Sequence, residues 1–392
     1  MLLALFQAGL ERVDGRRCVR EALGAARPQC PRVWLAAIGK AAAAMARGAH
    51  DALGAAIERT LLITRDLTPD AAHLGSARTV EIVLGSHPMP DERSLGAGAR
   101  LLAWTDALPR DAWPLFLISG GASSLVEVLT PGATLDELQR LTREAFAAGL
   151  AIGELNRRRS QLSRIKGGGL AARLRGRSAR ALFVSDVPGD DPGVIGSGLM
   201  GASPGVPDAI ERQVVASVDQ AVAAVGAEAR ARGLTVQTDP RRFTGSALRL
   251  AARFAHELRL APAQLCVWGG ESTVALPEHP GRGGRNQQLA LAAARLIAGH
   301  ADLMLLAAGT DGTDGVTEDA GALIDADTCA RVALAELDAD RCLEQADSAR
   351  ALAASGDLVH TGPTATNVGD MVIGLKLSLE AARALGAPHG GA

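Results

Sequence analysis

Gly39-Lys40 places a lysine where a strand turns into a helix, a position suited to binding phosphate. It follows the apolar run 32–38 and opens an Ala-rich stretch. A helix start presents N–H donors and a partial positive charge, which attract an anion, and Lys40 adds a full charge. Because a cation weakens a helix at this end, the conflict favours a functional role. The alternative is a lysine that simply reaches solvent.

The basic residues are biased toward arginine. Lysine and arginine together number 41, yet lysine occurs only at 40, 166 and 376. A lysine retained against this bias is a candidate for a role that needs a compact, strongly hydrated charge. Chance retention is the alternative for each of the three.

A turn of small residues, SGGASS, follows the predicted strand 114–119. Glycines let a ligand approach the backbone, and successive N–H groups form an anion-binding nest. A tight turn with serine caps would look the same. The candidate contacts are Ser119, Gly120, Gly121, Ser123 and Ser124.

The basic segment 156–166, NRRRSQLSRIK, contains no acidic residue. Such a segment is most often a solvated face. The alternative is a site for an anionic small molecule that uses Asn156, Arg159 and Lys166.

Three carboxylates, Asp186, Asp190 and Asp191, follow the predicted strand 180–185. Clustered carboxylates repel one another unless a cation or proton intervenes, and their oxygens suit Mg²⁺. Asp186, nearest the strand, could instead act as general base for a hydroxyl group. Simple turn chemistry is the third interpretation.

The second half of the chain repeats the pattern of polar residues after strands. Arg282 and Arg285 stand among glycines at a predicted helix start, where a guanidinium can fork around phosphate. Glu271, Asp311 and Asp314 follow the predicted strands 264–268 and 302–308, where they could hold a metal. The match to G-x-G-x-x-G at 196–201 is discounted, because it neither follows a strand directly nor opens a helix.

Strands alternating with helices predict an α/β fold with a mostly parallel sheet and helices on both faces. We expect two domains, a Rossmann-like domain at 1–235 and a smaller α/β domain at 236–392, with a long helix over about 208–232. In such sheets ligands bind at the carboxyl ends of strands. The polar turns above fall at such ends.

The composition narrows the class of protein. The chain has 392 residues and a net charge of −2, which argues against a nucleic-acid partner. Its apolar N-terminal stretch is too short to span a membrane and lacks a basic flank, so we expect a cytoplasmic protein. The residues alone predict a phosphotransferase or a phosphosugar binder.

Eight stretches together resemble the class II glycerate kinases, also called glycerate 2-kinases or the MOFRL family. They are GSHPMPD, LISGGASSL, NRRRSQLSRIKGGGLA, SDVPGDDP, GGESTV, GRGGRNQQ, GTDGTDG and TGPTATN, in the family's order over about 34–376. The resemblance implies two α/β domains with the site in the cleft between them. It also implies phosphoryl transfer from ATP to the 2-hydroxyl of D-glycerate with Mg²⁺ or another divalent cation, and small-molecule partners only. A homodimer is compatible with this, although the sequence does not give the oligomeric state.

The resemblance also suggests roles for the residues singled out above. Lys40 matches a lysine regarded as essential in the family, and Arg282 or Arg285 matches an arginine of similar role; Asp186 would orient or deprotonate the glycerate hydroxyl. The SGGASS turn with Asn156, Arg159 and Lys166 would bind glycerate or phosphate. The expected nucleotide contacts are Gly270, Glu271, Asn286, Thr310, Asp311 and Asn367, and the expected metal ligands are Asp190, Glu271, Asp311 and Asp314.

The chain departs from the family pattern at four positions. Ser160 and Gln161 stand where relatives often have a basic residue and a histidine, Ala122 replaces a glycine, and Gly369 replaces a residue that is often Asn. Some relatives carry the label hydroxypyruvate reductase, so an NAD(P)H-dependent reductase is one alternative function. A non-enzymatic regulator that binds phosphosugars is the other.

Overall fold

The computed structural model describes residues 1–25, 32–148, 152–203 and 205–377, and these form two compact units. One, here called the parallel-sheet unit, comprises Val13–Ser217 and Ala365–Val368. The other, the mixed-sheet unit, comprises Met1–Arg12, Val218–Thr364 and Gly369–Ala392. The predicted boundary after 235 differs from this division, because the first helix and the segment 218–235 belong to the mixed-sheet unit.

The parallel-sheet unit is built on six strands in the order β3-β2-β1-β4-β5-β6, and every neighbouring pair is parallel. The order reverses between β1 and β4, the arrangement of a doubly wound dinucleotide-type fold. The strands are β1 Val33–Ile38, β2 Ile57–Thr64, β3 Val80–Leu84, β4 Trp113–Ile118, β5 Ala179–Val184 and β6 Ile210–Ala216.

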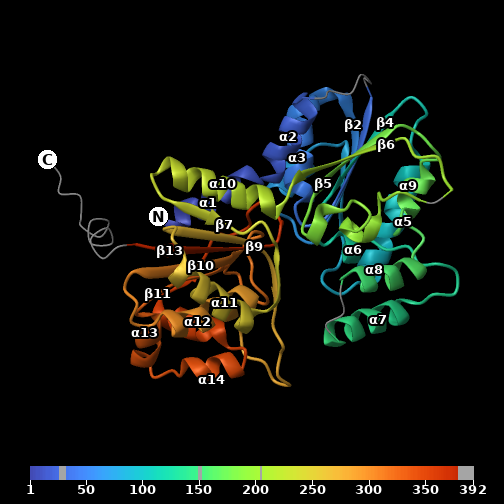
Figure 1. Ribbon diagram of the computed structural model, residues 1–392. Helices are drawn as coiled ribbons and strands as arrows, with labels where there is room; N and C mark the ends of the chain where they lie inside the picture. Colours follow the sequence, from blue (N-terminus) through green and yellow to red (C-terminus); the bar gives the residue numbers. More distant parts are fainter. Residues whose placement is uncertain (26–31, 149–151, 204, 378–392) are drawn as a thin grey trace. The chain divides into compact units, whose positions relative to one another are not determined.

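Helices cover both faces of this sheet, because its central strands are apolar on both sides and must be buried twice. Figure 1 shows α2 and α3 on one face and α5, α6 and α9 on the other. On the α5 face Trp34, Trp104 and Phe116 form a buried aromatic cluster. The helices are α2 Gly15–Ala25, α3 Ala42–Leu53, α4 Pro69–Gly75, α5 Glu92–Asp106, α6 Ala122–Leu125, α7 Leu135–Ala148, α8 Ile152–Gln161 and α9 Gly169–Arg173.

The mixed-sheet unit contains a seven-stranded sheet in the order β12-β11-β10-β13-β9-β7, with β8 also pairing with β9. Only β7 and β8 run parallel to β9, and the other pairs are antiparallel. The strands are β7 Val236–Thr238, β8 Phe243–Ser246, β9 Leu265–Thr273, β10 Leu303–Gly309, β11 Gly321–Asp325, β12 Leu358–Val359 and β13 Asp370–Lys376.

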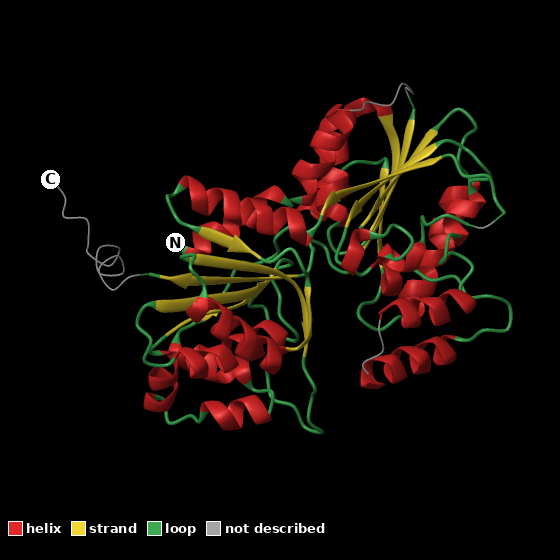
Figure 2. Ribbon diagram, viewed as in Figure 1, coloured by secondary structure: helices red, strands yellow, loops and turns green. Residues whose placement is uncertain are grey.

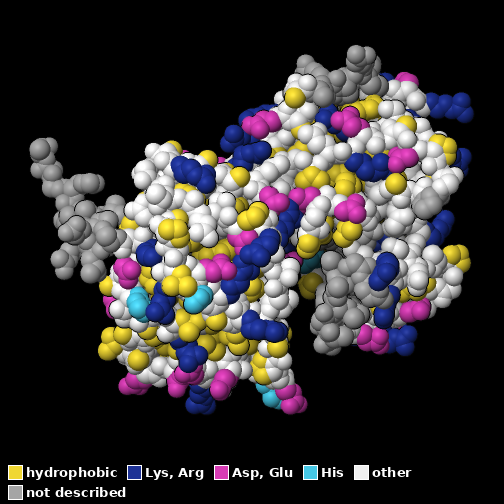
Figure 3. Space-filling model, viewed as in Figure 1, with side chains coloured by type: hydrophobic (Ala, Val, Ile, Leu, Met, Phe, Trp, Pro, Cys, Tyr) yellow, Lys and Arg dark blue, Asp and Glu magenta, His cyan; other side chains and the backbone are white. Residues whose placement is uncertain are grey.

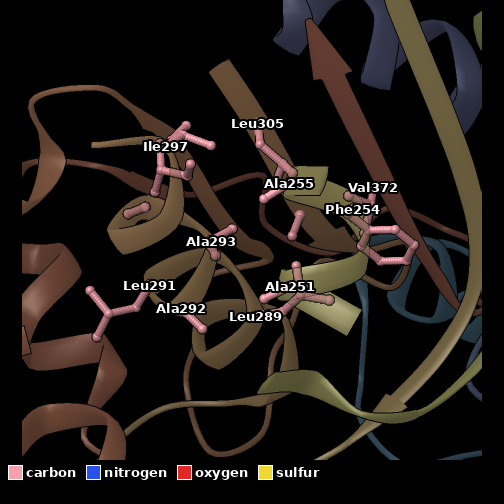
Figure 4. Close-up of a cluster of buried hydrophobic side chains, with 14 of the residues drawn as sticks. Ala251, Phe254, Ala255, Leu289, Leu291, Ala292, Ala293, Ile297, Leu305 and Val372 are labelled. Atoms are coloured by element: carbon pink, nitrogen blue, oxygen red, sulfur yellow. The ribbon is translucent and has the colours of Figure 1, made fainter. Parts of the chain in front are cut away.

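The core of the mixed-sheet unit lies between this sheet and two long helices, α11 and α12. Figure 4 shows Phe254 and Ala251 of α11 facing Leu289 and Ala293 of α12, with Val372 of the sheet behind them. Helices α1 and α10 cover the opposite face (Figure 2). The helices are α1 Leu2–Arg12, α10 Val218–Ala231, α11 Ala247–Leu260, α12 Arg285–Ile297, α13 Thr328–Leu334, α14 Ala339–Glu344 and α15 Ser348–Ser355.

The predicted fold class is confirmed, with one error in the elements. The α/β architecture and the parallel sheet covered on both faces are as expected. The predicted helix over 208–232 is wrong in its first part, because Ile210–Ala216 forms the edge strand β6 and helix α10 begins only at Val218. An edge strand with one solvent-exposed face lacks the continuous run of apolar residues that identified the inner strands.

The surface mixes charges of both signs. The face drawn in Figure 3 carries Lys and Arg side chains beside Asp and Glu side chains, without a continuous basic surface. Among the described residues, no helix is both long and apolar enough to cross a membrane.

Candidate functional site

The turns that follow β1 and β4 lie against each other where the strand order of the parallel sheet reverses. Gly39 has a φ of +131°, and a Cβ at this position would overlap Ser119. The amide of Lys40 donates to the carbonyl of Gly120 at 2.9 Å, and the amide of Ala41 donates to Ser119 Oγ at 3.1 Å. The reversal point of such a sheet is where ligands bind in open α/β folds.

Gly120 lets a carboxylate approach this turn. A Cβ at Gly120 would overlap Asp186 Oδ2 and Asn367 Nδ2, so no other residue fits here without moving them. Asp186 follows β5, and the amide of Asn367 donates to its Oδ2 at 3.3 Å. The prediction grouped Asn367 with the nucleotide contacts, whereas the structure brings it to Asp186 in the parallel-sheet unit.

Lys40 and His87 flank the next glycine, Gly121. A Cβ at Gly121 would lie 3.2 Å from both Lys40 Cγ and His87 Cδ2, and the φ of +84° at this residue also favours glycine. Lys40 is partly exposed. The turn therefore has a cation and an imidazole on one side and the Asp186 carboxylate on the other.

A chain of hydroxyl and amide groups links the SGGASS turn to helix α8. Ser197 Oγ lies 2.9 Å from both Ser123 Oγ and Asn156 Oδ1. Ser197 is buried and has a positive φ of 57°, a conformation that costs energy for a residue other than glycine. The structure thus joins the predicted residues Ser123 and Asn156, while Ser124 is buried and its hydroxyl faces the Gly121 carbonyl at 3.5 Å.

Lys166 does not lie open to a ligand, in contrast to the prediction. Its side chain and that of Glu127 are completely buried and form an ion pair. Burial lowers the pKa of Lys166, and the charge of Glu127 opposes this shift. Glu127 also accepts hydrogen bonds from Ser163 Oγ at 2.5 Å and from the amide of Val128 at 2.9 Å. The pair therefore braces the loop after α6 against the loop after α8.

Arg285 is held in place at one edge of the mixed sheet. Its Nε and Nη2 donate to the two oxygens of the buried Asp370 at 2.7 and 2.9 Å, and its Nη1 lies 2.5 Å from Glu271 Oε1. These carboxylates raise the pKa of Arg285 against the effect of burial. The residues meet because β13 starts where the antiparallel β9 and β10 end.

Asp314 closes the start of helix α12 and is not available as an open ligand. Its two oxygens accept from the amides of Asn286 at 3.1 Å and Gln287 at 2.8 Å. Burial raises the pKa of Asp314 to about 7, although these hydrogen bonds act in the opposite direction. The amide of Asn286 also donates to Asp370 at 3.0 Å.

The remaining predicted residues of this unit lie around the same edge. Thr310 is buried and donates to the carbonyl of Gly369 at 2.7 Å, and Asp311 accepts from both the amide and the hydroxyl of Thr313 at 3.1 Å. Gly270 pairs so closely with Phe243 of β8 that a Cβ would overlap the neighbouring backbone. Arg282 is exposed, and its backbone is held by Asp347 and Ala349.

The four predicted metal ligands do not form a preassembled metal cage. Among the described residues, no three His, Cys, Asp or Glu side chains are grouped so that they could hold a metal ion. Asp314 and Glu271 are engaged by backbone amides and by Arg285, respectively. Asp190 lies in the turn after β5 with a positive φ of 52°. Glu271 and Asp314 are thus already engaged by protein groups, and the metal ligands stay a prediction.

Four residues at these sites were not among the predicted contacts. His87 stands in the quoted motif GSHPMPD, which pointed to it. Asp370 is the first residue of β13, three positions after the quoted motif TGPTATN. Glu127 and Ser197 have no local signal, because their partners are 39 and 74 residues away in the sequence.

Comparisons with known proteins match most of the chain. Residues 1–229 match the domain of unknown function DUF4147, and residues 264–370 match the MOFRL family. The D-glycerate 2-kinase of Thermotoga maritima is 32% identical over 96% of this chain and 97% of its own. A protein of Agrobacterium vitis, provisionally named hydroxypyruvate reductase, is 34% identical over 95% of this chain and 93% of its own. The crystal structure of the Thermotoga maritima glycerate kinase has a TM-score of 0.83 and 31% identity, covering 96% of this chain and 98% of that one.

Proposed function

The chain belongs to the family that joins a DUF4147 domain to a MOFRL domain and includes D-glycerate 2-kinase, and we propose from this that it phosphorylates D-glycerate. ATP is the phosphoryl donor and 2-phosphoglycerate the product. The observation that best supports this chemistry is the cluster of Lys40, Asp186 and Asn367 around Gly120 and Gly121. It combines a cation with a carboxylate at the reversal point of the sheet.

Each member of this cluster has a step to perform. Phosphoryl transfer depends on positioning and on neutralising charge as it builds up on the transferring group. Lys40 supplies that charge. Asp186 accepts the proton of the attacking hydroxyl, and Asn367 fixes its orientation through Oδ2. Gly120 lets the Asp186 carboxylate and the Asn367 amide lie directly against the turn.

The nucleotide contacts stay predictions. They include the edge residues Gly270, Glu271, Asn286, Thr310 and Asp311, and one of the two arginines. Arg285 is already oriented by Asp370, whereas the Arg282 side chain makes no hydrogen bond within the described residues. A divalent cation such as Mg²⁺, when bound, would neutralise the phosphates of ATP, and no step here depends on a protein cage for it. The cytoplasmic location and the homodimer also stay predictions.

The decisive experiment is a coupled assay of ADP formation by the full chain with ATP and Mg²⁺. We expect ADP only when D-glycerate is added, with 2-phosphoglycerate as the phosphorylated product. Absence of glycerate-dependent ADP would falsify the proposal. The same preparation is tested for oxidation of NAD(P)H by hydroxypyruvate, the reaction of the alternative name. The turn after β1 argues against that reaction, because Lys40 stands where a dinucleotide fingerprint needs further glycines.

The variant Lys40→Arg tests whether a compact ammonium is needed at that turn. A planar guanidinium is larger and cannot replace a point charge beside Gly121 and His87. We expect kcat to fall by about 100-fold, the size of effect that a misplacement near 1 Å produces. The control is Lys376→Arg, whose Nζ donates to the carbonyls of Arg259 and Ala261 in the mixed-sheet unit. Equal activity of Lys40→Arg and the parent chain would show that lysine itself is not required.

A further inference from the structure

Arg159 is a buried cation with almost none of its hydrogen-bonding capacity used. It is 4% exposed. Its Nη2 donates to Thr142 Oγ1 at 3.3 Å, and its Nε has no partner within the described residues. A guanidinium has five N–H donors, and leaving them unmatched in a buried position costs free energy. Burial accordingly lowers the pKa of Arg159.

The surrounding charges do not balance this cation. Glu127 is the carboxylate that acts on both Arg159 and Lys166. One of its oxygens pairs with Lys166, and the other accepts from Ser163 and Val128. Two buried cations therefore share one carboxylate whose oxygens are already engaged. Among the described residues, these three groups therefore leave a net charge of +1, which an anion would neutralise.

Arg159 is linked to the SGGASS turn through Asn156, a residue of the same helix. It stands three positions after Asn156 on helix α8, so the two side chains lie on the same face of the helix. Asn156 is connected through Ser197 to Ser123, at 2.9 Å on each side. The unmatched guanidinium is thus one helical turn from the hydrogen-bonded groups of the candidate site.

We propose that Arg159 is the carboxylate subsite of the acceptor: its guanidinium takes the carboxylate of the small hydroxy acid through two parallel N–H···O bonds. This rests on the proposed function, since it assigns one end of D-glycerate. A guanidinium fork matches the planar geometry of a carboxylate, and a charge-assisted pair is stronger in a buried position. It also gives a role to a buried guanidinium that has one side-chain hydrogen bond within the described residues.

The test compares D-glycerate with its neutral amide and with a different anion. Calorimetry without ATP measures the affinity of the full chain for D-glycerate, D-glyceramide and inorganic phosphate. We expect D-glycerate to bind about 10- to 100-fold more tightly than the neutral amide, the range of a hydrogen bond to a charged group. In Arg159→Met this preference disappears, and the KM for glycerate rises by a similar factor while the KM for ATP stays the same. Arg159→Lys, which keeps the charge but not the fork, recovers part of it.

Stability separates this role from a structural one. Because the cation is uncompensated, Arg159→Met should leave the Tm of the unliganded protein unchanged or raise it. The control is Arg157→Met, an exposed position of the same helix, which should keep the preference for glycerate. A fall in Tm with the preference intact would make Arg159 a structural residue. Lower affinity for phosphate or ATP, with glycerate unaffected, would overturn the carboxylate assignment.

The subsite and the proposed function can fail separately. If the parent chain forms no ADP yet binds glycerate through Arg159, the kinase proposal is wrong and the subsite stands. If it forms ADP and Arg159→Met keeps the same KM for glycerate, only the subsite is wrong. If the parent chain is active but does not distinguish glycerate from glyceramide, the subsite is also wrong.

Discussion

Lys166 and Glu127 show how a single buried pair can support a site without touching a ligand. Both side chains are fully buried, and the Glu127 carboxylate also accepts hydrogen bonds from the Ser163 hydroxyl and the amide of Val128. A buried pair of this kind often adds little net stability, but removing one partner is costly. What the pair provides is a fixed relation between the loop after α6 and the loop after α8.

This predicts an asymmetric effect of mutation. Lys166→Met leaves Glu127 charged and unpaired, and we expect the free energy of unfolding in urea to fall by about 3 kcal/mol. The loss lies at the lower end of the usual range because the charge of Arg159 remains nearby. The double variant Lys166→Met, Glu127→Gln keeps an acceptor for Ser163 without the charge and should recover most of the loss. A double variant as unstable as the single one would contradict this account.

The sequence could single out residues whose type matters, but it could not always show whether their role is catalytic or structural. The scarcity of lysine marked Lys40 and Lys166 equally, since both stand in glycine-flanked turns. The structure places Lys40 at the candidate site and Lys166 in a buried ion pair. Burial of a lysine depends on its partner, and Glu127 lies 39 residues away, beyond any local pattern.

At the scale of elements, the start of helix α12 depends on a carboxylate from a different loop. Asp314 accepts from the amides of Asn286 and Gln287, the role that a capping side chain usually performs from within its own turn. Because burial raises its pKa to about 7, this contact changes protonation near neutral pH.

The raised pKa of Asp314 predicts that its contribution to stability falls as pH rises. Between the unfolded value of 3.8 and the folded value of about 7, the folded state holds a proton that the unfolded state has lost. From pH 5 to pH 8 the parent chain should therefore lose roughly 3 kcal/mol of stability relative to Asp314→Asn, the cost of about two pH units. Urea unfolding of both proteins at the two pH values measures the difference. A difference that does not change with pH would exclude a raised pKa.

The prediction of elements succeeded where strands were apolar on both faces and failed where they were not. Strands β1 and β5 are buried throughout, β4 is buried except at Trp113, and all three were found within one residue of their ends. Strand β6 alternates between partly buried and exposed residues and was absorbed into a predicted helix. No local signal distinguishes the antiparallel pairing of β10 and β13 from a parallel one, because direction is set by the connections.

At the scale of the whole molecule, the chain does not build its two units one after the other. Helix α1 packs with α10 in the mixed-sheet unit, and a Cβ at Gly9 would meet Val225 and Met371. The chain then forms the parallel-sheet unit and re-enters the mixed-sheet unit at Val218. It contributes one further segment to the parallel-sheet unit, Ala365–Val368. This short segment brings Asn367 to Asp186. The two residues are 181 positions apart, so local sequence patterns could not predict their contact.

This order of the chain predicts which unit loses stability when helix α1 is destabilised. Phe6 is 2% exposed, and Phe6→Ala should lower the stability by about 3–5 kcal/mol. Hydrogen exchange should then accelerate in α10 and β13 and remain slow in β1 and α3. Phe116→Ala, a fully buried residue of β4, is the matched control and should give the opposite pattern. Faster exchange in the parallel-sheet unit of Phe6→Ala would contradict the assignment of α1.

The contribution of the four residues Ala365–Val368 to the parallel-sheet unit also limits how genes of this family can recombine. A crossover between the two matched regions, 1–229 and 264–370, would separate Asp186 from its partner Asn367, and α1 and α10 from the sheet they cover. The two halves therefore cannot be inherited as interchangeable parts. A functional hybrid of two relatives would have to take both ends of the chain, including α1, from one parent and the stretch 365–368 from the other.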